Sequence, residues 1–144
     1  MHDQMSRRLK MLGMLLFLIG LITGLIIMQL KNTRMGLAAH LEGVMNGTFL
    51  VVAGFLWTEL KIGVGLKKIL FWTLIYGTFM NWFFTLLAAI LGTSKMTPLS
   101  GAGYNGAEWQ EMLVTAGLVT LSLAMVFSLA VIVYGLRGKI FADH

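Results

Sequence analysis

The sequence predicts an all-α integral membrane protein, a four-helix bundle with both termini in the cytoplasm. Of its 144 residues, 58% are hydrophobic and 12% are charged, and the mean hydropathy is +0.83. Four apolar stretches can each cross ~30 Å of hydrocarbon, which takes roughly 20 residues. Their apolar residues are continuous rather than alternating, which favours helices, because a helix satisfies its backbone amides within one segment. This composition excludes a water-soluble domain, a disordered chain and a nucleic-acid binder.

The helices are expected at residues 11–30, 36–59, 68–92 and 110–136 of a single transmembrane domain, residues 1–144. The first is too long for the apolar core of a signal peptide and lacks a small-residue cleavage site, so we expect a retained helix. The second contains His40, Glu42 and Asn46. The third is uncharged and rich in aromatic residues, and the fourth ends against Arg137 and Lys139.

Basic residues set the expected orientation. With a cytoplasmic N-terminus, eight lysines and arginines fall inside and three outside, in line with the positive-inside rule. The inner set is Arg7, Arg8, Lys10, Lys61, Lys67, Lys68, Arg137 and Lys139, and the outer set is Lys31, Arg34 and Lys95. The net charge of +5 then indicates contact with anionic membrane lipids, and a bacterial inner membrane is the expected location. The one long connection, residues 93–108, would form an outer lid or a linker.

The second helix carries the polar residues that suggest chemistry. Ionisable side chains within a span cost about 2.5–3.5 kcal/mol each on insertion scales and usually face a bundle interior or a cavity. At about 100° per residue, Glu42 and Asn46 lie ~40° apart, whereas His40 points ~160° away from Glu42. One helix therefore presents two polar faces. The chain has no cysteine and its other histidines are terminal, so thiolate chemistry is excluded and His40 is the only histidine within the spans.

Each feature also has a structural interpretation. His40 can be a satisfied polar residue rather than a metal ligand, and Glu42 can extend outward to the membrane boundary. Gly43 and Gly47 follow His40 on its face. They either permit close packing of another helix or leave a flat slot in which a planar macrocycle lies beside the imidazole.

The third helix adds Tyr76 and Asn81 among aromatic side chains, which usually face lipid. Asn81 lies in mid-span and needs a polar partner. Together with Asn46 it suggests a polar pocket in an aromatic-lined bundle, suited to a small aromatic substrate.

Three parts of the chain resemble the hydroxylaminobenzene mutase family of small membrane proteins. They are residues 31–47 (KNTRMGLAAHLEGVMNG), residues 76–78 with Asn81-Trp82, and the glycine-rich loop before the fourth helix. The resemblance runs from the first helix to Arg137-Gly138. It implies an isomerase that rearranges an N-arylhydroxylamine, such as hydroxylaminobenzene, to an ortho-aminophenol such as 2-aminophenol, without net redox.

A more distant resemblance is to styrene oxide isomerase, which shares four helices and the pattern of His40 followed by Asn46-Gly47. It implies a homotrimer that holds haem b between subunits, with His40 as the axial ligand of the iron. The ferric haem would act as a Lewis acid. Asn46 would then lie on the substrate side, and Glu42 or Tyr76 would shuttle a proton. Where that family has an acidic residue before glycine in its third helix, this chain has Tyr76.

In the predicted site, His40 is the metal ligand and binds the cofactor together with Gly43 and Gly47. The catalytic candidates are Glu42, Asn46, Tyr76 and Asn81. Because His40 faces away from Glu42, we expect a composite site with the haem ligand from one subunit and the catalytic residues from the next. Three other functions stay open. They are isomerisation of an aryl epoxide such as styrene oxide, electron transfer by a b-type cytochrome with Met45 or Met80 as second ligand, and transport with Glu42 as coupling carboxylate.

Overall fold

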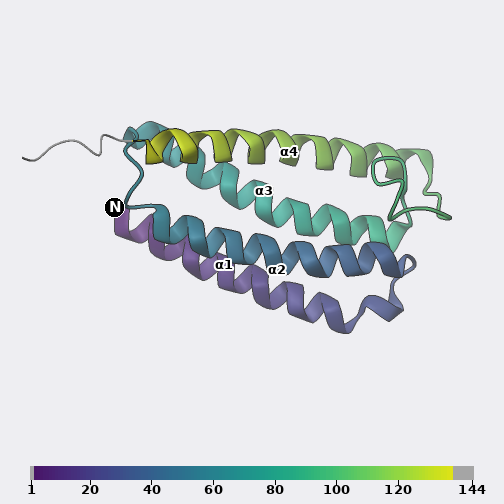
Figure 1. Ribbon diagram of the computed structural model, residues 1–144. Coiled ribbons are helices and arrows are strands. Elements are labelled where there is room, and N and C mark those ends of the chain that lie inside the picture. Colours follow the sequence, from purple (N-terminus) through teal and green to yellow (C-terminus); the bar gives the residue numbers. More distant parts are fainter. Residues whose placement is uncertain (1, 138–144) are drawn as a thin grey trace, which may run out of the picture.

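The computed structural model describes residues 2–137, which fold into long helices in up-and-down order (Figure 1). They are α1 (His2–Leu25), α2 (Thr33–Leu56), α3 (Val64–Leu91) and α4 (Glu108–Leu136), with a short 3₁₀ helix, η1 (Ile27–Gln29), between the first two. All four are long and apolar enough to cross a membrane, and no strand occurs within residues 2–137. The expected all-α membrane class is therefore confirmed.

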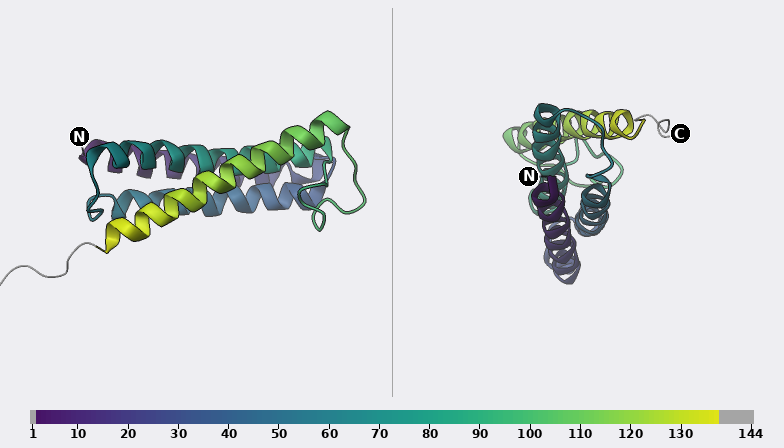
Figure 2. Two further views of the ribbon diagram at one scale, coloured as in Figure 1. Left: turned by 90° about the horizontal axis from the view of Figure 1, so that it is seen from above. Right: turned by 90° about the vertical axis from the view of Figure 1, so that its left-hand side faces the viewer.

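The four helices form an open row rather than a closed ring. α2 lies between α1 and α3, whereas α4 packs against α3 and touches neither α1 nor α2 through its backbone. Figure 2 shows α4 crossing the other helices obliquely. One apolar core surrounds Trp57 and Leu74, and a second surrounds Met35 and Ala88 at the other end. The outer surfaces of α1 and α4 are left for lipid or for another subunit.

All four helices start earlier than expected, α1 and α2 end five and three residues earlier, and the ends of α3 and α4 agree within one residue. α1 begins at His2 instead of residue 11, since long basic side chains remain compatible with a helix when they reach the headgroup layer. It ends at Leu25 instead of residue 30, because the chain tightens there into η1, beginning with a bond from the Ile26 N–H to the Thr23 carbonyl. α2 starts at Thr33 because the Asn32 side chain caps it, accepting from the Met35 N–H at 3.1 Å.

The long connection between α3 and α4 folds as an ordered cap. Glu111, a buried carboxylate of α4, accepts backbone N–H bonds from Ser94, Lys95 and Gly106 at 2.9–3.2 Å. Asn32 donates from its side-chain amide to the Ser100 carbonyl at 2.9 Å. Both ends of the connection are thus tied to helices, so it is a cap rather than a free linker.

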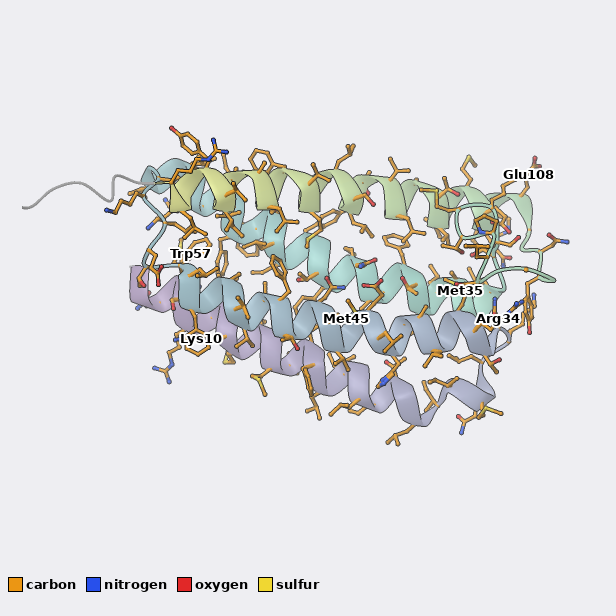
Figure 3. All side chains as sticks on the ribbon, in the orientation of Figure 1. Lys10, Arg34, Met35, Met45, Trp57 and Glu108 are labelled. Atoms are coloured by element: carbon orange, nitrogen blue, oxygen red, sulfur yellow. The ribbon has the colours of Figure 1, made fainter. Side chains whose placement is uncertain are left out.

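The cap marks one end of the molecule. Figure 3 shows Arg34, Met35 and Glu108 at this end and Lys10 and Trp57 at the opposite end. The start of α1 and the end of α4 lie together at the end away from the cap (Figure 1). That this end is cytoplasmic stays a prediction from the distribution of basic residues.

Candidate active site

α1 and α2 touch through glycines. A Cβ atom on Gly43 would lie 2.5 Å from Gly20 Cα, and one on Gly47 would lie 2.5 Å from the Phe17 backbone nitrogen. Side chains do not fit at such distances, so only glycine permits this approach. Gly43 and Gly47 therefore pack against α1, and the flat slot expected beside His40 is filled by α1 itself.

His40 lies at the same interface, and its imidazole rests on α1. Nδ1 is 2.8 Å from the Gly20 carbonyl oxygen, so Nδ1 carries the proton and donates it to that carbonyl. A Cβ on Gly24 would be 2.8 Å from the same nitrogen, which shows how closely the ring lies against the helix. Nε2 has no hydrogen-bond partner within residues 4–137, and its lone pair remains available.

This arrangement fits a metal ligand, because ligating histidines donate their other ring N–H to a carbonyl or carboxylate that fixes the tautomer. Residues 4–137 contain no group of three or more histidine, aspartate or glutamate side chains able to hold a bare ion. His40 therefore suits a metal that brings its other ligands with it, as the iron of a porphyrin does.

A second polar group, which we call the Glu42 cluster, lies between α2 and α3. It consists of Glu42, Asn46 and Asn81. Oε2 of Glu42 accepts from the side-chain amide of Asn46 at 2.8 Å and from that of Asn81 at 2.6 Å. Oε1 accepts no hydrogen bond from the part of the chain that the structure describes. The cluster thus unites three predicted catalytic residues, and it leaves one carboxylate oxygen free for a ligand.

The two polar faces of α2 meet different neighbours, as the helical spacing predicted. His40 contacts α1, and Glu42 contacts α3. Within one subunit the free imidazole nitrogen and the free carboxylate oxygen therefore lie on different sides of α2.

Tyr76 lies outside this cluster. Its hydroxyl is 2.9 Å from Thr120 Oγ1 on α4. An open groove of about 980 Å³ runs along α4, and Thr120, Met112 and Trp109 line it. Neither His40 nor Glu42 lines this groove, so the groove is separate from the polar residues of α2.

The sequence did not point to Thr23, which the structure connects to this region. The indole N–H of Trp82 on α3 donates to Thr23 Oγ1 on α1 at 3.0 Å. The available signal was weak, a single hydroxyl within the apolar run of the first helix. Trp82 was part of the Asn81-Trp82 pair that carries the family resemblance, but its position gave no sign of a contact with the first helix.

Comparison with known proteins places the chain in a family. The family model of styrene oxide isomerase matches residues 5–137. Hydroxylaminobenzene mutase HabB of Ectopseudomonas oleovorans is 43% identical over 135 residues, which cover 93% of this chain and 82% of that protein. Hydroxylaminobenzene mutase HabA of the same organism is 39% identical over 125 residues, 86% of this chain and 93% of that protein. No solved structure gives a significant match. These matches confirm the resemblance noted above: the chain belongs to the styrene oxide isomerase family and is a membrane isomerase of the mutase kind.

Proposed function

We propose that this chain is a haem-dependent mutase that rearranges an N-arylhydroxylamine to an ortho-aminophenol. The names of both relatives support this substrate class. One observation carries the proposal. α2 presents an imidazole with a free Nε2 on one face and a carboxylate with a free oxygen on the other. The first group suits a haem ligand and the second suits proton transfer.

His40 would hold the haem through Nε2, since Gly20 keeps the proton on Nδ1. When bound, the haem supplies an iron with an open coordination position, which acts as a Lewis acid toward the N–O group of the substrate. Because α1 fills the glycine face of α2, we place the haem between subunits rather than within one.

The proton balance of the reaction assigns a task to Glu42. The N–O bond breaks and the oxygen bonds to the ortho carbon, which loses a proton, while the nitrogen gains one. No oxidant or reductant is needed. Oε1 of Glu42 would take the proton from the carbon and return it to the nitrogen, and such acid–base help is typically worth about 10²–10⁴ in rate. Asn46 and Asn81 orient the carboxylate through Oε2, so they act as positioning residues.

A homotrimer would bring the two faces into one site. If Nε2 of His40 in one subunit points toward the Glu42 cluster of the next, the ligand and the proton carrier converge on a shared substrate. The open row supports this assembly, because the outer surfaces of α1 and α4 are uncovered within a subunit. The expected setting is a bacterial inner membrane with cytoplasmic termini, which an uncharged aromatic substrate reaches through the lipid.

The test begins with the absorption spectrum of the protein purified in detergent after expression with haem. We expect a Soret band that His40→Ala abolishes and that the matched control His2→Ala retains. Wild-type protein should convert phenylhydroxylamine to 2-aminophenol without any reductant, and His40→Ala should not. A colourless protein that is nevertheless active would refute the requirement for haem. Absence of 2-aminophenol would refute the assignment of an N-arylhydroxylamine as substrate.

An aryl epoxide is the second candidate substrate, because the matching family model is that of styrene oxide isomerase. Opening of an aryl epoxide to an aldehyde moves a hydride within the substrate, so it needs no external proton carrier. Incubation with styrene oxide therefore separates the candidates, and Glu42→Gln should impair only the hydroxylamine reaction.

A further inference from the structure

We propose that Trp82 is a positioning residue for His40 and acts through Thr23. This inference rests on the proposed role of His40 as a haem ligand. Trp82 holds one turn of α1 in place, and the carbonyl that receives the imidazole proton belongs to that turn. The role of Trp82 is therefore to keep Nε2 of His40 unprotonated and available.

The first step is the link between α3 and α1. The Trp82 indole N–H donates to Thr23 Oγ1 at 3.0 Å, and the same hydroxyl donates to the Ile19 carbonyl at 2.9 Å. Thr23 is buried, with 2% of its surface exposed. The Thr23 hydroxyl thus donates to a carbonyl of its own helix α1 and accepts from Trp82 of α3. Both its donor and its acceptor are satisfied without a water molecule.

The second step is that this turn also receives His40. The Gly20 carbonyl, which accepts from Nδ1 at 2.8 Å, directly follows Ile19 in the chain. Gly24, against which the ring lies, directly follows Thr23. Any displacement of the turn therefore moves both surfaces that orient the imidazole.

The third step is the path of Trp82 across α2. A Cβ on Gly43 would lie 3.0 Å from Trp82 Cδ1 and 2.5 Å from Gly20 Cα. Trp82 and Gly20 thus meet at Gly43, where α2 has no side chain to keep them apart. Three helices are in contact at this point, beside His40.

The consequence concerns the tautomer of His40. A neutral imidazole carries one proton, and the hydrogen bond made by one nitrogen decides which nitrogen is left to bind a metal. Without the Trp82 donor, the turn is no longer tied to α3 and Nδ1 loses its fixed acceptor. The tautomer with the proton on Nε2 then becomes populated, and it cannot ligate iron through Nε2. Loss of such an outer partner typically reduces metal affinity about 10–100-fold.

The experiment uses Trp82→Phe, which removes the indole donor, and Thr23→Val, a variant of similar shape that removes its acceptor. Thr23→Ser keeps the hydroxyl and should restore wild-type behaviour. Ser128→Ala is the matched control, because Ser128 likewise bonds its own helix and a side chain of another helix, at 2.8 Å each. Each protein is prepared haem-free in detergent micelles, its His40 ring nitrogens are observed by ¹⁵N NMR, and haem is then titrated.

We expect wild type, Thr23→Ser and Ser128→Ala to carry the proton on Nδ1. Trp82→Phe and Thr23→Val should show a mixture of tautomers and about 10-fold weaker haem binding. An unchanged tautomer with haem affinity within twofold of wild type in both variants would overturn the inference. A wild-type protein that shows the Nδ1 tautomer but binds no haem would instead refute the proposed function, while the tautomer shift in the variants would still support the positioning role.

Discussion

Replacing Glu42 with glutamine separates proton transfer from structure. In the native protein, Oε2 accepts two amide bonds, at 2.8 Å from Asn46 and 2.6 Å from Asn81. Glutamine has the same shape and retains a carbonyl oxygen that accepts both bonds. Its amide nitrogen then takes the place of Oε1, and it cannot accept a proton. The substitution therefore preserves the contacts and removes the proposed chemistry.

The expected loss of stability in Glu42→Gln is smaller than the expected rise of the reaction barrier, so the two effects can be distinguished. Hydrogen bonds to a charged group are worth about 1.5–3 kcal/mol and those to a neutral group about 0.5–1.5 kcal/mol, so Glu42→Gln weakens each bond by roughly 1 kcal/mol. Since Glu42 is only partly buried, this is an upper limit. Loss of acid–base help reduces turnover about 10²–10⁴-fold, equivalent to about 2.7–5.5 kcal/mol in the barrier. Glu42→Ala should lose turnover as well, and it additionally destabilises the fold because two amides lose their acceptor.

The assay measures kcat for conversion of phenylhydroxylamine to 2-aminophenol, together with the Soret band and thermal unfolding in detergent. Glu108→Gln is the control, because Glu108 is an exposed carboxylate at the start of α4. We expect Glu42→Gln to keep the Soret band and to unfold at most a few degrees below wild type, while kcat falls at least 100-fold. A kcat within threefold of wild type in a properly folded Glu42→Gln protein would refute the assignment of Glu42 as the proton carrier.

Three further predictions test the surrounding structure. Gly47→Val should destabilise the protein by at least about 1–3 kcal/mol, because its side chain would collide with the Phe17 backbone; an unchanged unfolding midpoint in denaturant would contradict this. Glu111→Ala should release the cap, since three backbone N–H groups lose their shared acceptor, and limited proteolysis should then cut within residues 93–107 much faster than in wild type. Tyr76→Phe should lose one hydrogen bond, worth about 1 kcal/mol, and leave kcat unchanged, whereas a large fall in kcat would place its hydroxyl at the substrate.

The polar faces of the second helix were predictable because helical geometry alone separates His40 from Glu42. The pairing of Glu42 with Asn46 follows from the same spacing, since residues four apart lie on one face. The contact with Asn81 depends on the register between two helices, which spacing within one helix does not determine. Spacing does, however, argue against grouping Tyr76 with Asn81. Five residues along a helix turn the direction by ~140°, and the two side chains indeed meet different helices.

The glycines of the second helix could indicate either close helix packing or a slot for a cofactor. The glycines of the first helix already favoured close packing. Gly13 and Gly20 are seven residues apart and lie on one face of α1. This face of α1 therefore also carries glycines in place of larger side chains. When two spans each carry such a face, the backbones of the two helices can approach closely along it, and Gly20 does face Gly43. α1 thereby covers the glycines on the face of α2 that carries His40, and His40 itself stays only partly buried. If His40 binds a haem as proposed, the macrocycle would have to extend beyond the subunit, because α1 already fills the glycine face of α2.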